Sequence, residues 1–289
     1  MTLVAAAQFG PVIGDVDGNR HAAAQAVRQA AEQGARLVVL PELCDSGYVF
    51  TGPDEARSLA TRAAASPTLR HWRDLAAAHG CAVVGGFCEL GDDGLLYNSA
   101  ALVDSSGTRA VYRKAHLWDR EKLIFTPGAA APPVAGLPSG RVAVMICYDL
   151  EFPEWARRAA LDGADLIAAP VNWPSGAAAP CPAGERPPEV VKAQADASVN
   201  GVYVVVADRC GAERGVDWIG GTMIVGPGGY PVAGPVLADR PAVLVADCDL
   251  PGTRDKRINE HNDLLADRRP ELYRAITPGN DEGWVPARH

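Results

Sequence analysis

The hydrophobic residues of this chain cluster in short runs, separated by longer stretches in which apolar residues recur at helical spacing. A hairpin is predicted at residues 221–232, around a Pro-Gly-Gly turn. Repeated alternation of strands and helices is typical of an α/β fold. In chain order, the short runs predict strands at 3–9, 37–40, 81–90, 98–103, 108–114, 142–146, 165–171, 201–208 and 242–249.

Capping residues mark the ends of the predicted helices. Ser66 and Pro67 place a capping hydroxyl and a first-turn proline at the start of one helix, which ends at Gly80. Asp17 or Asn19 is expected to cap an earlier, alanine-rich helix. Helices are predicted at 17–33, 67–80, 153–161 and 189–200, and a long proline-rich loop at 174–188.

The composition is that of an ordinary globular protein: 289 residues, 48% hydrophobic and 21% charged. An α/β chain of this length buries a sufficient core in one unit, so we expect one folded domain over 1–266 and an extended polar tail over 267–289. The net charge of −8, with no compensating basic cluster, argues against a nucleic-acid or membrane partner.

The cysteines and histidines are scattered. Seven cysteines without a closely spaced pair argue against a disulfide framework and favour a reducing, cytoplasmic location. We see neither a signal-peptide pattern nor an apolar run near the roughly 20 residues that a transmembrane helix needs. No metal-ligand spacing and no glycine-rich phosphate loop is found, so no metal and no cofactor is predicted.

Three predicted strands end in residues that carry chemistry. The buried strand 142–146 leads into Cys147, Glu42 follows strand 37–40, and Lys114 ends the second strand of a hairpin. Singly, each has a plainer interpretation: a structural cysteine, a solvated carboxylate and a surface lysine. Because ligands of α/β sheets bind outside the carboxyl ends of strands, the three side chains would meet if these strands are neighbours.

A glutamate, a lysine and a cysteine in one site suit acyl transfer from nitrogen. Glu42 would remove the thiol proton, Cys147 would attack, and Lys114 would stabilise the oxyanion. Lys114 is also expected to favour the thiolate, within the limits set by nearby carboxylates. A further carboxylate, Glu121, follows in a loop that ends in a Pro-Gly turn.

Five segments of the chain carry a family resemblance. They are Pro-Glu-Leu-Cys-Asp-Ser-Gly-Tyr at 41–48, Tyr-Arg-Lys-Ala-His-Leu at 112–117, Ile-Cys-Tyr-Asp-Leu-Glu-Phe-Pro-Glu at 146–154, Asn-Trp-Pro at 172–174 and Asp-Arg-Arg-Pro-Glu-Leu-Tyr at 267–273. In this order they resemble the hallmarks of the nitrilase, or carbon–nitrogen hydrolase, superfamily, and the resemblance extends over about residues 2–273.

The resemblance implies a four-layer α-β-β-α sandwich and a Glu42–Lys114–Cys147 triad. It also implies that Glu121 is an additional glutamate that orients the lysine and the substrate. The backbone N–H of Tyr148 would join Lys114 as an oxyanion donor. The implied substrate-binding residues are Tyr48, Tyr148, Asn172 and Trp173, and the implied assembly is a homodimer or a higher homo-oligomer.

Within the family, the chain looks like the amidase branch. Nitrilases tend to have Trp-Glu after the cysteine, whereas Tyr148 and Asp149 stand here, so nitrile hydrolysis ranks last. A catalytically silent binding module would be expected to lack a triad residue, and none is missing. Aromatic residues near the triad, Trp118 among them, favour a small carboxamide with an apolar acyl group.

N-carbamoyl amino acids or amines are the alternative substrates. An amino acid of this kind needs a cation for its carboxylate, and the residues 177–188 could form a rim around the pocket. The loop arginines that could supply the cation are Arg120, Arg186, Arg209 and Arg214.

Overall fold

The computed structural model describes residues 1–176, 181–182 and 184–273, and it divides the chain into two compact units, Met1–Arg254 and Asp255–His289. The predicted boundary after residue 266 lies within the second unit and stays a prediction. In the described part of that unit, the predicted extended tail holds one short 3₁₀ turn, η5 (Pro270–Leu272). Residues 274–289 of the tail lie outside the described residues.

Two six-stranded sheets form the centre of the first unit. The first has the order β14-β1-β2-β3-β4-β5, with β1 (Thr2–Gln8), β2 (Leu37–Val39), β3 (Ala82–Leu90), β4 (Leu96–Asp104), β5 (Gly107–Arg113) and β14 (Ala242–Cys248). The second has the order β13-β12-β9-β8-β7-β6, with β6 (Val134–Leu137), β7 (Gly140–Val144), β8 (Leu166–Pro170), β9 (Tyr203–Ala207), β12 (Met223–Val225) and β13 (Pro231–Ala233). The neighbours β1, β2 and β3 are parallel, as are β7, β8 and β9.

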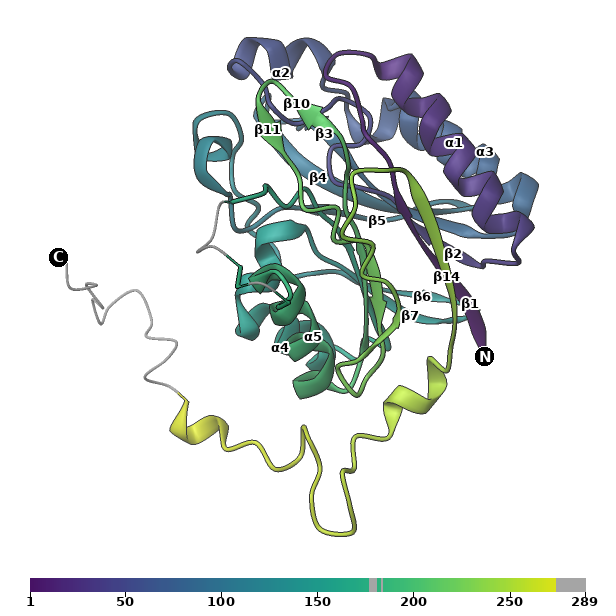
Figure 1. Cartoon of the computed structure of the whole chain (residues 1–289), viewed down its shortest axis with the longest axis vertical. Coiled ribbons are helices and arrows are strands. Elements are labelled where there is room, and N and C mark those ends of the chain that lie inside the picture. Colours follow the sequence, from purple (N-terminus) through teal and green to yellow (C-terminus); the bar gives the residue numbers. More distant parts are fainter. Residues whose placement is uncertain (177–180, 183, 274–289) are drawn as a thin grey trace, which may run out of the picture. The chain divides into compact units, whose positions relative to one another are not determined.

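Helices cover the outer face of each sheet (Figure 1). Successive side chains of a strand point to opposite faces. Accordingly, Val4 and Ala6 of β1 pack into the core between the sheets, whereas Ala5 and Ala7 pack into the core beneath α1 and α3. The predicted α-β-β-α sandwich is therefore confirmed. The helices are α1 (Val16–Glu32), α2 (Pro53–Leu59), α3 (Pro67–His79), α4 (Pro153–Leu161) and α5 (Pro188–Asn200).

Local predictions succeed where a cap is strong. Ser66 accepts a hydrogen bond from the N–H of Leu69 and begins α3 as predicted. The predicted cap of α1 is wrong: Asp15 accepts from the N–H of Gly18, because the helix begins one residue earlier than expected. Asn19 instead is buried and donates to the carbonyl oxygens of Val12 and Asp45.

Several short elements carry no pattern that predicts them: α2, β6 and the two-residue strands β10 (Ala212–Glu213) and β11 (Val216–Asp217). The 3₁₀ turns η1 (Ala63–Ala65), η2 (Asp119–Leu123), η3 (Cys147–Glu151) and η4 (Pro251–Arg254) were likewise not predicted. Of the predicted pocket rim at 177–188, residues 177–180 and 183 lie outside the described residues. No helix in the described part of the chain is long and apolar enough to cross a membrane.

Candidate active site

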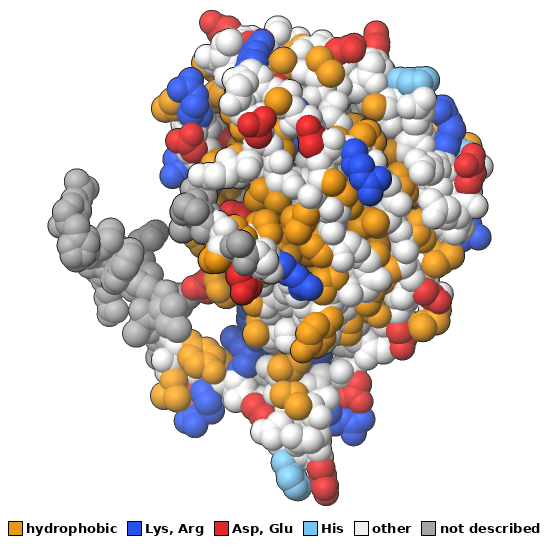
Figure 2. Space-filling model, in the orientation of Figure 1, with side chains coloured by type: hydrophobic (Ala, Val, Ile, Leu, Met, Phe, Trp, Pro, Cys, Tyr) orange, Lys and Arg blue, Asp and Glu red, His pale blue; other side chains and the backbone are white. Residues whose placement is uncertain are grey.

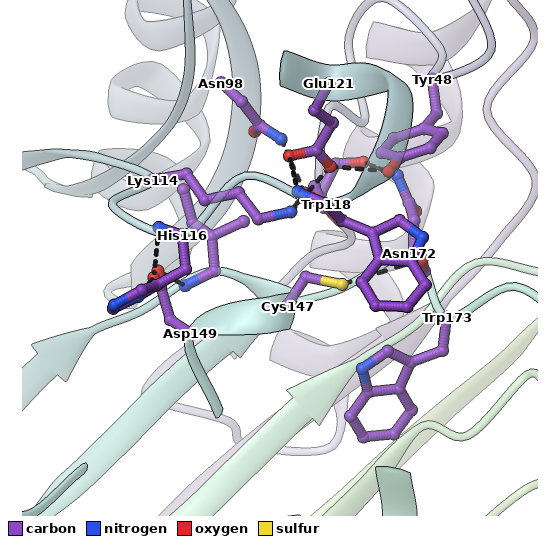
Figure 3. Close-up of polar contacts among 12 residues, drawn as sticks. Tyr48, Asn98, Lys114, His116, Trp118, Glu121, Cys147, Asp149, Asn172 and Trp173 are labelled. Carbon is purple, nitrogen blue, oxygen red and sulfur yellow. Dashed lines mark hydrogen bonds and ion pairs between the residues drawn. The ribbon is translucent and has the colours of Figure 1, made fainter. Parts of the chain in front are cut away.

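Three strands of the two sheets lead into one buried cluster (Figure 3). Glu42 comes shortly after β2, Lys114 directly after β5, and Cys147 shortly after β7, at the start of η3. All three side chains are buried. The structure thus brings together the three residues that the strand ends predicted.

Lys114 lies between two carboxylates. Its Nζ donates to Oε1 of Glu42 and to Oε1 of Glu121, each at 2.7 Å, and all three side chains are buried. Burial lowers the pKa of Lys114, but the two carboxylates raise it by more, so that the net pKa lies well above the ordinary value. The side chain is therefore an ammonium group with three N–H donors, and the carboxylates take two of them.

The two carboxylates differ in their remaining partners. Oε1 of Glu121 also accepts from the Tyr48 hydroxyl at 2.6 Å, and its Oε2 accepts from the N–H of Trp118 at 3.1 Å. Oε1 of Glu42 also accepts from the Asn98 amide at 2.7 Å, but its buried Oε2 has no hydrogen-bond partner among the described residues. Glu42 alone of the pair has an oxygen ready to accept a proton.

Burial raises the pKa of Glu42 to about 7, with Lys114 acting against this shift and Glu121 adding to it. A carboxyl with a pKa near 7 can both accept and return a proton at neutral pH, as a general acid–base group must.

Cys147 begins η3 with a φ of 47°, in the left-handed region that residues other than glycine rarely adopt. Its Sγ lies 3.8 Å from the carbonyl oxygen of Asn172. Burial and, after it, the charge of Glu42 raise the thiol pKa well above its ordinary value, although Lys114 lowers it. Lys114 thus favours the thiolate as expected, within limits: its effect on the pKa is outweighed by burial together with the nearby carboxylates.

Strained backbone recurs around this cluster. Leu43, the neighbour of Glu42, has a φ of 45°, and Asp119, two residues before Glu121, has a φ of 42°. Non-glycine residues hold such angles only where the surrounding structure imposes them, and they concentrate at functional sites.

Asp149 is a further buried residue of the site, one for which no role was predicted. Its Oδ2 accepts from the Tyr112 hydroxyl at 2.8 Å and from the N–H of Ile146 at 3.1 Å. Its Oδ1 accepts from the N–H of His116 at 3.1 Å and lies 2.7 Å from the His116 Nδ1. Asp149 thus ties the cysteine turn to the segment that follows Lys114. Its place in the Cys-Tyr-Asp segment was the signal for it.

The predicted substrate-binding residues are placed in different ways. Asn172 donates from Nδ2 to the carbonyl oxygen of Glu42 at 3.0 Å and supports the backbone of the cluster. Trp173 is buried, with its ring close to Gly221. Tyr148 packs edge-on against Trp118, with 4.9 Å between ring centroids.

A cavity of about 360 Å³ reaches Glu121. Tyr48 and Trp118 are the predicted pocket residues that line it. Its other walls are mostly apolar and include the aromatic rings of Phe50, Phe125 and Trp218. The complete lining is Tyr48, Val49, Phe50, Trp118, Asp119, Arg120, Glu121, Ile124, Phe125, Pro174, Val216 and Trp218.

Of the four loop arginines, Arg120 lines this cavity. Arg186 donates to Gln194, and Arg214 is paired with Glu55. Arg209 is buried. Among the described residues, no group of three or more His, Cys, Asp or Glu side chains could hold a metal ion.

Comparisons with known proteins place the chain in a family. The carbon–nitrogen hydrolase family model matches residues 3–258. A protein named nitrilase from Pyrococcus abyssi is 40% identical over 273 residues, covering 94% of this chain and 99% of the relative. An N-carbamoylputrescine amidase from Solanum tuberosum is 32% identical over 304 residues, covering 96% of this chain and 95% of the relative.

A solved structure agrees. A mutant of the amidase from Nesterenkonia sp. AN1, with acrylamide added to its active-site cysteine, matches with a TM-score of 0.77 and 28% identity, covering 96% of this chain and 100% of that one. This chain belongs to the carbon–nitrogen hydrolase family and is a hydrolase of the nitrilase superfamily.

Proposed function

We propose that this carbon–nitrogen hydrolase is an amidase that converts a small carboxamide into its acid and ammonia through a thioester on Cys147. The observation that carries the proposal is the buried, unpartnered Oε2 of Glu42, on a carboxyl whose charge acts on the cysteine thiol. Such an oxygen is suited to take the thiol proton when the sulfur attacks.

In the proposed cycle, Glu42 takes up protons and gives them back. Glu42 takes the proton of Cys147 as Sγ bonds to the amide carbon. The remaining N–H of Lys114 and the backbone N–H of Tyr148 stabilise the oxyanion. Glu42 then protonates the nitrogen as the C–N bond breaks and ammonia leaves. Finally Glu42 activates a water that hydrolyses the thioester and restores the thiol.

Glu121 has a positional role in this proposal. Its two oxygens accept three hydrogen bonds, from Lys114, Tyr48 and Trp118, so it has little capacity to carry a proton. In this proposal Glu42 transfers protons and Lys114 stabilises the oxyanion. Cys147 attacks the substrate, and Glu121 orients Lys114.

The apolar, aromatic cavity beside Glu121 supports an acyl group that is itself apolar or aromatic. N-carbamoyl compounds remain the second candidate, because Arg120 lines the same cavity and a relative is named N-carbamoylputrescine amidase. Tyr148, Asn172 and Trp173 support the site in this proposal chiefly through its backbone and walls.

The deciding experiment compares ammonia release from a primary amide, an N-carbamoyl compound and a nitrile of similar size. We expect the highest kcat/KM for the amide. A tenfold preference for either other class, about 1.4 kcal/mol in transition-state binding, would overturn the amidase assignment. Cys147→Ala and Lys114→Met should abolish turnover with the fold retained, which circular dichroism and thermal unfolding check.

We further propose a homodimeric, cytoplasmic enzyme. All seven cysteines are free, which suits a reducing compartment. Exposed apolar residues on α5 and β13 support self-association.

A further inference from the structure

We propose that Glu213, held by Arg209, is a positioning residue for the reaction: it fixes the loop that carries Tyr48, so that the Tyr48 hydroxyl keeps Glu121 in place on Lys114. This inference rests on the proposed function, and it adds two residues that lie outside the five family segments.

Glu213 lies on β10 and binds two consecutive backbone N–H groups. Its Oε2 accepts from Tyr48 at 2.9 Å and from Val49 at 2.6 Å. The carboxylate is buried, 5% exposed, so water does not compete for these bonds. Two neighbouring peptide groups bound to one oxygen leave the backbone of Tyr48 little freedom to rotate.

Arg209 holds Glu213 in turn. Its Nη2 lies 3.1 Å from Oε1 of Glu213 and donates to the carbonyl oxygen of Pro11 at 2.8 Å. The guanidinium group lies 4.6 Å from the ring centre of Trp218, and Trp218 packs edge-on against Tyr48 with 5.4 Å between centroids. Backbone and ring of Tyr48 are therefore both supported by one cluster.

A single atom, Oε1 of Glu121, links Tyr48 to the proposed reacting groups. Oε1 of Glu121 accepts from the Tyr48 hydroxyl at 2.6 Å and from the Lys114 Nζ at 2.7 Å (Figure 3). If the tyrosine moved, Glu121 would lose this donor and could turn. Lys114 would then lose its alignment with the position of the oxyanion.

The energetics also favour a positional role. A buried ion pair is often no more stabilising than apolar residues of similar size, because both charges lose their hydration. Arg209 is 1% exposed, and two of its nitrogens have no hydrogen-bond partner among the described residues. Arg209 was also a candidate to bind the carboxylate of an N-carbamoyl amino acid. Its burial argues against that role.

The test is a double-mutant cycle with Glu213→Ala and Tyr48→Phe, measured as kcat and KM. A displacement of about 1 Å can lower the rate on the order of 100-fold. We therefore expect each single variant to lower kcat about 10- to 100-fold, with a smaller change in KM. Because both act through the same hydroxyl, the double variant should be no more than about twofold worse than the poorer single variant.

Independent, multiplicative losses would overturn the proposal, as would an unchanged kcat in Glu213→Ala. Glu213→Gln keeps one acceptor oxygen and should recover part of the rate. If Glu213→Ala fails to fold, Glu213→Gln replaces it in the double-mutant cycle with Tyr48→Phe. Asp165→Asn is the matched control, because Asp165 is likewise a buried carboxylate that pairs with an arginine, Arg254, and binds a backbone N–H, that of Arg141. The double-mutant cycle uses whichever substrate the wild-type protein hydrolyses. Its result therefore tests the positioning role of Glu213 even if the amidase proposal is wrong.

Discussion

Two glutamates bind the same lysine nitrogen, yet only Glu42 keeps an oxygen without a hydrogen-bond partner among the described residues, and this gives the two carboxylates different chemistry. The sequence located Glu42, Lys114 and Cys147 because each follows a strong strand pattern. It did not indicate which carboxylate keeps a free oxygen. That depends on the second oxygen, which in Glu121 accepts from the N–H of Trp118 and in Glu42 has no partner among the described residues. Asn98 and Tyr48 both bind the other oxygen, which Lys114 also binds.

The raised pKa of Glu42 predicts the acid limb of the pH–rate profile. The group must be ionised to accept the thiol proton, so kcat/KM should fall as the pH drops through about 7. Glu42→Gln should remove turnover at every pH. Initial rates between about pH 5 and 9 measure this, and a profile that stays flat down to about pH 5.5 would contradict the role of Glu42.

At the scale of elements, close contact between β3 and the loop after β2 places Glu42. The N–H of Gly86 donates to the carbonyl oxygen of Pro41, and its own carbonyl oxygen accepts from the N–H of Cys44, both at 3.0 Å. A Cβ on Gly86 would lie 2.3 Å from the nitrogen of Leu43 and 2.6 Å from the Cα of Glu42. Only glycine fits between these backbones.

Gly86→Ala should therefore displace Glu42, lower kcat and destabilise the fold by about 1–3 kcal/mol, the usual cost of overpacking. Gly136→Ala on β6 is the matched control, because nothing lies within 4 Å of its added Cβ. Urea unfolding and kcat measure both variants. Equal behaviour of the two would show that the contact at Gly86 does not position the loop.

The long, regular elements were predictable and the short ones were not. Strands such as β3 and β7 coincide largely with apolar runs, and α3 shows a cap and a terminal glycine. A seven-residue helix such as α2, or the two-residue strands β10 and β11, is too short for any period to emerge. Glu213 lies on β10, which explains why sequence patterns gave no signal for it.

At the scale of the whole molecule, exposed apolar residues support self-association. They lie on α5 and on β13 with the turn before it, which are neighbours because Gln194 donates to the carbonyl oxygen of Gly229 at 2.7 Å. Figure 2 shows hydrophobic side chains gathered near the centre of the face on which α5 lies in Figure 1. The α5 patch consists of Val191, Val199, Tyr230 and Val232, which are 52%, 45%, 78% and 51% exposed.

We expect this patch to bind a second copy by two-fold symmetry. Val191→Glu should convert the dimer to a monomer of 30.3 kDa in light scattering. Leu95→Glu is the control, since Leu95 is 45% exposed and lies between β3 and β4. A wild-type protein that is monomeric at all concentrations would contradict the proposal.

Buried carboxyl groups also make stability depend on pH. Burial raises the pKa of Asp45, Asp196 and Asp208 to about 7, from an ordinary value of 3.8. The folded protein therefore binds more protons than the unfolded chain between these values, and the stabilisation is lost as the pH rises through about 7. The free energy of unfolding should therefore fall between about pH 4 and 7. Asp196→Asn should weaken this fall by about 1–3 kcal/mol, as urea titrations at both pH values would measure; an unchanged slope would contradict it.

The proposed nucleophile, Cys147, keeps its proton at rest, and this bears on oxidative damage. Peroxide reacts with thiolates rather than thiols, and burial together with Glu42 holds Cys147 in the thiol form. Cys181, in contrast, is exposed. Hydrogen peroxide should therefore oxidise Cys181 first, as mass spectrometry can follow, while activity persists. Loss of activity before Cys181 is modified would show that the resting sulfur is not protected, so this fold would need external reductants to endure oxidising conditions.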